Sequence, residues 1–165
     1  MTHSIVQPPA LPQPGIRTGG FFELWHVVDS AEIDSQNHVH NLRYLQWSLW
    51  ATGKHTSALG HDADGELACG YGFVVREHDA TYRQAALADD RVCLRTWIDS
   101  MDAHSAWRTT YITRPADQTW LVRVRTRWVY ADLENHRLAM IPQRLRDAAP
   151  VLPSPPPMPW QDDAT

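Results

Sequence analysis

The sequence has few cysteines and no long apolar run, and each absence excludes a class of protein. Its 165 residues include two cysteines, Cys69 and Cys93, too few for a disulfide framework or a four-cysteine zinc site. No segment approaches the roughly 20 apolar residues that a membrane-spanning helix needs. The proline-rich start also lacks the basic and apolar regions of a secretion signal. We therefore expect a cytoplasmic protein with reduced thiols and no membrane partner.

The sequence also lacks a large excess of either positive or negative charge. The chain carries 15 lysines and arginines against 19 aspartates and glutamates, a net charge of −4, and no basic cluster dominates. Domains that bind nucleic acid concentrate basic residues on one surface, so we expect no nucleic-acid partner. In contrast, 43% of the residues are hydrophobic, which is enough to fill the core of the single domain that this length suits.

Two proline-rich segments flank a central domain. Residues 1–19 form an N-terminal extension and residues 149–165 a C-terminal tail, and their composition predicts extended, poorly ordered chain. Trp160 is the one residue that suggests docking of the tail. We expect the folded domain at residues 20–148.

Apolar periodicity predicts one helix and about five strands. Residues 41–60 carry a wide apolar arc between Asn41, a good N-cap, and Gly60, a plausible stop, so this helix should be buried over much of its circumference. Five segments are rich in β-branched and aromatic residues or alternate with period two, as strands do, and short turns between the later four favour an antiparallel meander: residues 21–30, 71–83, 90–100, 105–114 and 119–132. The pattern predicts an α+β fold, an antiparallel sheet wrapped around one long buried helix.

A short motif precedes the predicted helix. The string D-x-x-x-H-V-x-N-x-x-Y-x-x-W consists of Asp34, His38, Val39, Asn41, Tyr44 and Trp47. Together with the order of the elements, it resembles the hotdog-fold acyl-CoA thioesterases of the 4-hydroxybenzoyl-CoA thioesterase-like group, over about residues 21–146. Glu32 and Asn37 depart from the family pattern, which has an aspartate and a glycine at these positions.

The resemblance implies hydrolysis of an acyl thioester without a cofactor or metal. The reaction needs a carboxylate, as nucleophile or general base, and donors for the oxygen that becomes negative. We predict Asp34 as the carboxylate, ahead of Glu32 and Asp29, because residues 41–59 contain no aspartate or glutamate. In the family, the oxyanion contact comes from the backbone N–H at Asn41, at the positive end of the helix. The choice between nucleophile and base stays open.

Other residues of the motif are predicted to assist or to hold the substrate. His38 is placed to hydrogen-bond Asp34 or orient a water, and a histidine that only fills the loop is an equally good interpretation. Val39, Tyr44 and Trp47 are expected to line the acyl pocket, although core packing alone would also explain the two aromatic residues.

The partner of the acyl group is expected to be coenzyme A or an acyl-carrier protein. Arg83 and Arg91 flank a turn and are predicted to meet phosphates, whereas the arginine stripe at residues 123–127 is better explained as a solvated strand face. Asp102 stands where the family has a basic cluster, which keeps the carrier protein open as a substrate. A metal site would need His38 and His40 to converge with His26 or His61.

Three further expectations complete the prediction. Members of this family work as oligomers, so we expect a homodimer or homotetramer whose second subunit completes the site. A hotdog dehydratase or hydratase is the alternative enzyme, but it usually needs a carboxylate from the helix, which is missing here. A hotdog module that binds an acyl thioester without turnover is the non-enzymatic alternative.

Overall fold

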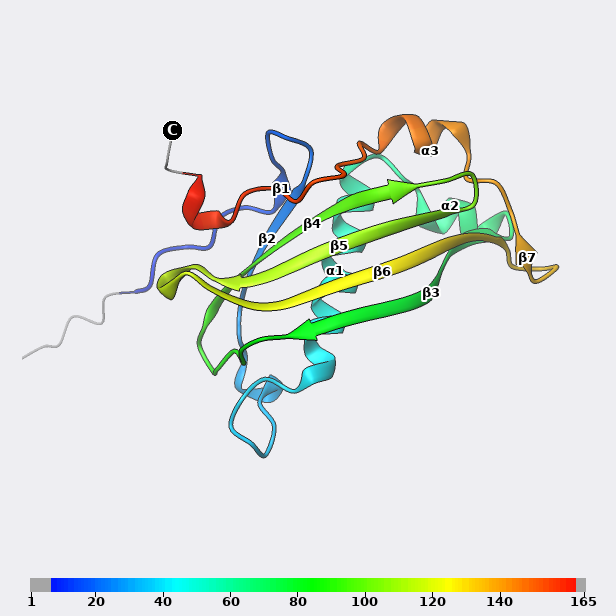
Figure 1. Cartoon of the computed structure of the whole chain (residues 1–165). Coiled ribbons are helices and arrows are strands. Elements are labelled where there is room, and N and C mark those ends of the chain that lie inside the picture. The colour runs from blue at the N-terminus through cyan, green and yellow to red at the C-terminus, as the bar shows by residue number, and fades with distance from the viewer. Residues whose placement is uncertain (1–6, 163–165) are drawn as a thin grey trace, which may run out of the picture.

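One curled antiparallel sheet surrounds a long helix in the computed structural model, which describes residues 7–162 (Figure 1). The sheet has the strand order β1 (Gly15–Ile16), β2 (Phe22–Val27), β4 (Arg91–Met101), β5 (Ser105–Arg114), β6 (Thr119–Asp132) and β3 (Tyr71–Tyr82), and β7 (Arg137–Leu138) also pairs with β6. The helices are α1 (Asn41–Ala58), α2 (Ala63–Ala68) and α3 (Gln143–Ala148), with short 3-10 turns at Ser30–Glu32, Pro115–Asp117 and Pro159–Gln161. The predicted fold class, with five long strands around one helix, is confirmed.

Helix α1 begins and ends close to its predicted limits. Gly60 has a φ of +84°, a left-handed conformation that glycine adopts without strain, and the helix ends just before it. The prediction that Asn41 caps the helix is wrong. The cap is His40, whose backbone is extended and whose Nδ1 accepts a hydrogen bond from the Leu42 N–H at 3.2 Å.

The core lies between α1 and the concave face of the sheet. Five alternating strand residues are at most 1% exposed: Val92, Leu94, Ile112, Val122 and Val124. They pack against Tyr44, Trp47 and Ala51 of the helix. Each buried aliphatic side chain of this kind contributes about 1.5–3 kcal/mol to folding, so this face determines the register of the strands.

The connection between β3 and β4 differs from the prediction. A short turn predicted a hairpin, but β3 pairs with β6 at one edge and β4 pairs with β2 and β5. Backbone hydrogen bonds between Val28 and the end of this connection hold β4 beside β2. The Val28 N–H donates to the Asp90 carbonyl, and the Asp89 N–H donates to the Val28 carbonyl. The chain therefore crosses the sheet between β3 and β4.

Both proline-rich ends, predicted from sequence as extended and poorly ordered chain, contact the domain within residues 7–19 and 149–162. On the N-terminal side β1 pairs with β2. On the C-terminal side the Leu152 N–H donates to the Ile98 carbonyl at 2.8 Å, and Arg95 contacts the Pro157 carbonyl and Asp162. Residues 1–6 and 163–165 lie outside the described part, and the domain limits at 20 and 148 stay a prediction.

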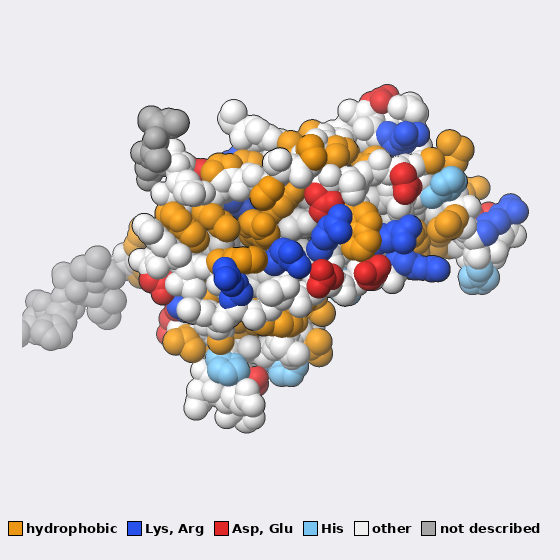
Figure 2. Space-filling model, viewed as in Figure 1, with side chains coloured by type: hydrophobic (Ala, Val, Ile, Leu, Met, Phe, Trp, Pro, Cys, Tyr) orange, Lys and Arg blue, Asp and Glu red, His pale blue; other side chains and the backbone are white. Residues whose placement is uncertain are grey.

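No helix among the described residues is long and apolar enough to cross a membrane. The outer face of the sheet mixes charged and apolar side chains, and Figure 2 shows Lys and Arg side chains interspersed with Asp and Glu side chains across it. Arg123 pairs with Asp79 at 3.3 Å and Arg125 with Asp99 at 2.9 Å. These pairs agree with the interpretation of the arginine stripe as a solvated strand face.

Candidate active site

The loop before α1 is closed by its own backbone. Ile33 and Val39 form an isolated antiparallel bridge, and the Asp34 N–H donates to the His38 carbonyl at 3.0 Å. Inside this loop the Asn37 N–H donates to the Asp34 carbonyl at 3.1 Å. The chain thus reverses within a few residues and returns Asp34 toward the start of the helix.

Asn37 occupies the position where the resembling family has glycine. Its φ is +64°, in the left-handed region that most side chains avoid. Asparagine is one of the few other residues that adopt this region readily. The departure from the family pattern therefore leaves the loop conformation intact.

The segment between β3 and β4 supports this loop from the other side. The Val39 N–H donates to the Ala86 carbonyl at 2.9 Å, and the Ala86 N–H donates to the Tyr44 hydroxyl at 2.8 Å. Burial raises the pKa of Tyr44 despite the hydrogen bond from Ala86, so the phenol stays neutral. Tyr44 therefore ties the first turn of α1 to this segment.

The loop around Asp34, the first turn of α1 and the segment between β3 and β4 enclose a cleft of about 620 Å³. It is lined by six of the eight residues predicted for the site, Asp34, His38, Val39, Asn41, Tyr44 and Arg83, and by Ser35, Gln36, His40, Tyr82, Gln84 and Ala85. Sequence reasoning missed Tyr82, whose hydroxyl donates to the Asn41 carbonyl at 3.2 Å. In the sequence, only its position at the end of a predicted strand, beside Arg83, indicated that Tyr82 could lie near the site.

Trp47 and Arg91 lie outside the cleft. Trp47 is 4% exposed and its Nε1–H donates to Glu32 at 2.8 Å. The Arg91 guanidinium donates to the carbonyls of Pro9 and Ala10 in the N-terminal extension. Arg83 does line the cleft, and its guanidinium lies 4.5 Å from the centre of the Trp120 ring.

The Asp34 carboxylate keeps one oxygen available. Its Oδ1 accepts a hydrogen bond from the Gln36 N–H at 2.8 Å, whereas its Oδ2 has no hydrogen-bond partner within residues 7–162. The side chain is 23% exposed, which gives a small molecule access to it. The His38 Nδ1 is 3.9 Å from Oδ1, too long for a hydrogen bond, so the predicted hydrogen bond between the two side chains is not formed.

The helix end at the cleft has an unused donor. The Asn41 N–H donates to no acceptor of the described chain, and the first turn of α1 contains no acidic residue. An uncompensated helix N-terminus carries about half a positive charge. A carboxylate and a helix N-terminus that favours negative charge therefore line the same cleft.

The two other candidate carboxylates have structural tasks. Glu32 accepts hydrogen bonds from Trp47 and from the Asp29 N–H, and contacts the His26 Nε2 at 2.8 Å. Burial acts to raise the pKa of Glu32, but these hydrogen bonds outweigh it and hold the pKa below its ordinary value. Asp29 caps the 3-10 turn through the Ala31 N–H at 2.8 Å. Neither carboxylate lines the cleft.

Asp102, which departs from the family's basic cluster, belongs to the turn between β4 and β5. Its carboxylate accepts hydrogen bonds from the N–H groups of His104 and Ser105 and from the Ser105 hydroxyl. These contacts lower its pKa and stabilise the turn. Asp102 does not line the cleft, so its charge is no argument about substrate binding there. Within residues 7–162, no group of three His, Cys, Asp or Glu side chains is placed to hold a metal ion.

Comparison with known proteins extends beyond the motif. The model of the thioesterase-like superfamily matches residues 28–149. No curated protein sequence matches the chain with significance. Among solved structures, a 1,4-dihydroxy-2-naphthoyl-CoA thioesterase from Synechocystis, Slr0204, has a TM-score of 0.74 at 21% identity and covers 78% of this chain and 95% of its own.

Two further structures share the fold. The gentisyl-coenzyme A thioesterase BH1999 has a TM-score of 0.69 at 19% identity, over 76% of this chain and 98% of its own. The 12:0-ACP thioesterase from Umbellularia californica also has a TM-score of 0.69, at 18% identity, over 78% of this chain and 49% of its own. At such identities the likeness shows the fold, while the matched family model covers most of the chain.

Proposed function

Because the chain belongs to the thioesterase-like superfamily, we propose that it hydrolyses acyl-CoA thioesters in the cleft lined by Asp34 and Asn41. The observation that carries this proposal is the shared cleft, in which an accessible carboxylate oxygen and an unused helix N-terminal N–H line the same space. An acyl-carrier protein is a second possible donor of the acyl group, since structures with this fold include a thioesterase named for each carrier.

In the proposed reaction, the thioester carbonyl oxygen accepts a hydrogen bond from the Asn41 N–H. Negative charge develops on this oxygen as the carbonyl carbon becomes tetrahedral, and one such donor stabilises the transition state by about 3 kcal/mol. The helix dipole acts in the same direction. The carbon–sulfur bond then breaks and the thiol leaves.

Asp34 supplies the base or the nucleophile. As a base, its Oδ2 removes a proton from water, the hydroxide adds to the carbonyl carbon, and the proton passes to the departing thiolate. As a nucleophile, the carboxylate itself attacks and forms an anhydride, which water then hydrolyses. Both routes consume one water and release a carboxylic acid and a thiol.

His38 and Arg83 have auxiliary tasks in this proposal. His38, whose Nδ1 lies 3.9 Å from the Asp34 Oδ1, is placed to orient a water beside the carboxylate. Arg83 lies at the exposed rim of the cleft, where a guanidinium can bind a phosphate of coenzyme A. Trp47 and Arg91 are left out, because other contacts of the chain occupy their polar groups.

The proposal includes a homo-oligomer. Strand β3 is a twelve-residue edge of the sheet, and long unpaired edges are rarely left open in soluble proteins. Exposed apolar side chains accompany this edge and the outer side of α1, including Val74 and Tyr82 on β3 and Leu42 and Leu49 on α1. A second copy that pairs with β3 would cover both.

Substitution of Asp34 tests the proposed chemistry. We expect Asp34→Asn to lower the release of free thiol from acyl-CoA substrates by at least about 100-fold, because the amide neither accepts a proton nor attacks. The panel would contain short-chain, long-chain and aromatic acyl-CoAs together with a dodecanoyl-carrier protein. Glu134→Gln, an exposed carboxylate in the turn after β6, is the matched control and should keep full turnover.

The same measurement separates the alternatives. A dehydratase would change the acyl group without free thiol, and a binding module would bind the thioester without either product. Retained thiol release in Asp34→Asn, with a circular dichroism spectrum like that of the wild type, would exclude Asp34 as the catalytic carboxylate.

A further inference from the structure

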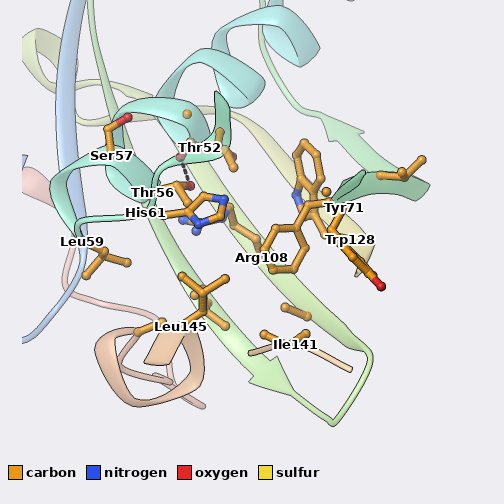
Figure 3. Close-up of a pocket in the computed structure, with 18 of the residues that line it drawn as sticks. Thr52, Thr56, Ser57, Leu59, His61, Tyr71, Arg108, Trp128, Ile141 and Leu145 are labelled. Atoms are coloured by element: carbon orange, nitrogen blue, oxygen red, sulfur yellow. Dashed lines mark hydrogen bonds between the residues drawn. The ribbon is translucent and has the colours of Figure 1, made fainter. Parts of the chain in front are cut away.

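A second cavity lies at the opposite end of α1 from the cleft. It encloses about 380 Å³, a size found for small-molecule sites. Its walls come from the C-terminal half of α1, the first residues of β3 and the segment around α3, and Figure 3 shows Arg108, His61 and Leu145 around one hollow.

The two spaces share no lining residue. On α1 the lining of the cleft ends at Tyr44 and the lining of the cavity begins at Leu49, about 7.5 Å further along at the helical rise of about 1.5 Å per residue. The cleft ends at Tyr82 of β3 and the cavity at Val74, about 26 Å apart along an extended strand. The cavity is therefore separate from the proposed active site of the same chain.

The lining of the cavity is mostly apolar but contains a buried cation. Arg108 is 6% exposed, and its Nη1–H donates to the His55 Nδ1 at 2.7 Å. This is the one hydrogen bond of its guanidinium within residues 7–162, and no carboxylate there forms an ion pair with it. Burial lowers the pKa of Arg108 to about 10, so it remains positively charged at neutral pH.

His55 does not balance this charge. It is fully buried, and burial together with the adjacent Arg108 lowers its pKa to about 3. Because Nδ1 accepts from arginine, the proton is on Nε2 and the ring is neutral. The other titratable groups that line the cavity are His61, whose pKa burial also lowers, Tyr71 at the start of β3, and Asp64, which is exposed at the rim on α2.

Another buried arginine of the chain is treated differently. Arg95 is 4% exposed, and its guanidinium pairs with Glu23 at 2.7 Å and with Asp162. A buried cation without an anion loses its hydration and gains little in return, which is why such groups are almost always paired. Arg108 thus lacks a counter-charge that the fold provides for Arg95.

We propose that this cavity binds an amphiphilic monocarboxylate, with its carboxylate on Arg108 and its apolar body against Ile98, Leu145 and Trp128. One guanidinium supplies one positive charge and a planar pair of donors, which matches a carboxylate. A phosphate dianion would leave one negative charge uncompensated among apolar side chains. The site lies apart from the cleft of its own chain, although Leu49 and Val74 of its lining are among the apolar residues that the proposed second copy covers. Hydrolysis of an acyl thioester would release a molecule of this class.

Calorimetric titration of the full chain with octanoate tests the proposal, with 1-octanol as the uncharged ligand of equal chain length. We expect octanoate to bind at least tenfold more tightly than octanol to the wild type, and to raise its melting temperature. In Arg108→Met we expect this preference to disappear. Arg125→Met, on the outer face of the sheet, is the matched arginine control and should bind octanoate like the wild type.

A second variant tests the cavity without touching the charge. Gly53 lines the cavity from α1, and a Cβ added there meets no atom within 4 Å. Gly53→Leu should keep the helix, since leucine favours helix over glycine, and fill the space that the ligand needs. We expect it to weaken octanoate binding at least tenfold while Arg108 stays in place.

The outcomes are distinct from those of the catalytic test. Asp34→Asn should bind octanoate like the wild type, even when its turnover is lost. Absence of octanoate binding to the wild type, equal affinity for octanol, or unchanged octanoate binding in Arg108→Met would each overturn the proposal. Loss of octanoate binding in Asp34→Asn would show that octanoate binds in the cleft, and this result would overturn the proposal as well.

Discussion

Glu32 and Asp34 lie two residues apart, and their surroundings give them different tasks. Both oxygens of Glu32 are engaged by His26, Trp47 and the Asp29 N–H, which keeps this carboxylate ionised and fixed. Asp34 has one engaged oxygen and one without a partner in the described chain. A carboxylate held by three contacts cannot approach a substrate, so the residue type alone does not identify the catalytic group.

The lowered pKa of Glu32 makes a contribution to stability that depends on pH. Because its folded pKa lies below the unfolded value, the ionised form favours folding, and this contribution is present above the unfolded pKa of about 4.3 and lost as pH falls through the folded pKa. We expect Glu32→Gln to lower the free energy of unfolding at pH 7, and to have a smaller effect near pH 3. Urea unfolding of both proteins at the two pH values measures this difference, and an equal effect at both would contradict the assignment.

Asn37 illustrates how one residue can replace glycine in a loop. At φ +64° glycine is unstrained and asparagine nearly so, whereas a β-branched residue would be strongly disfavoured. From sequence, a missing family glycine looks like a reason against the motif. The backbone angle shows that the loop conformation needs a left-handed residue at this position, and asparagine meets that need.

At the scale of elements, helix α1 serves different purposes at its two ends. Asn41 at its N-terminus lines the cleft, and its C-terminal half forms a wall of the second cavity. Between them, Trp47, Ala51 and His55 face the sheet and are buried. The apolar arc of α1 is wide because the helix faces the cleft, the sheet and the second cavity.

The segment between β3 and β4 supports the loop that carries Asp34, through Tyr44. In Tyr44→Phe the Ala86 N–H loses its buried acceptor, which costs about 1–3 kcal/mol. We expect this loss in denaturant unfolding, together with a lower kcat for thiol release, since residues 83–90 also hold Val39 of the Asp34 loop. Tyr71→Phe is the matched control, because Tyr71 is 38% exposed and makes no hydrogen bond through its hydroxyl within residues 7–162. Unchanged stability in Tyr44→Phe would show that the contact contributes nothing.

At the scale of the whole molecule, the family and the fold are confirmed as those of thioesterases. The oligomer and a cytoplasmic location stay predictions. The sheet has one short edge strand, β1, and one long one, β3, and the asymmetry points to β3 as the edge that a second copy covers.

A proline at the bulge of β3 tests this assembly. Arg76 lies at the register shift between Val75 and Glu77 and has no paired residue on β6, and bulges of this kind are where a strand tolerates proline best. Proline does block the approach of another strand to the edge. We expect light scattering to show an oligomer for the wild type and for Arg76→Ala, and a monomer for Arg76→Pro. A monomeric wild type, or an oligomeric Arg76→Pro that remains folded, would contradict the proposed assembly through β3.

The sequence by itself determined the elements, the core and the motif that lines the cleft. Helical and strand periodicities depend on neighbours along the chain, so α1 and the five long strands were predicted within a few residues of their limits. The motif from Asp34 to Tyr44 spans one loop and one helix start, and local spacing was enough to predict that its members meet.

Only the tertiary structure decided which distant residues become partners. The expected hairpin between β3 and β4 is a crossover in the structure. Trp47 donates a hydrogen bond to Glu32, and Arg91 donates to a carbonyl of the N-terminal extension. Arg95 and Arg108 both belong to strands, yet one meets Glu23 and Asp162 and the other meets a neutral histidine. The reason is physical: these pairings join residues between 15 and 82 positions apart, and packing rather than local pattern brings them together.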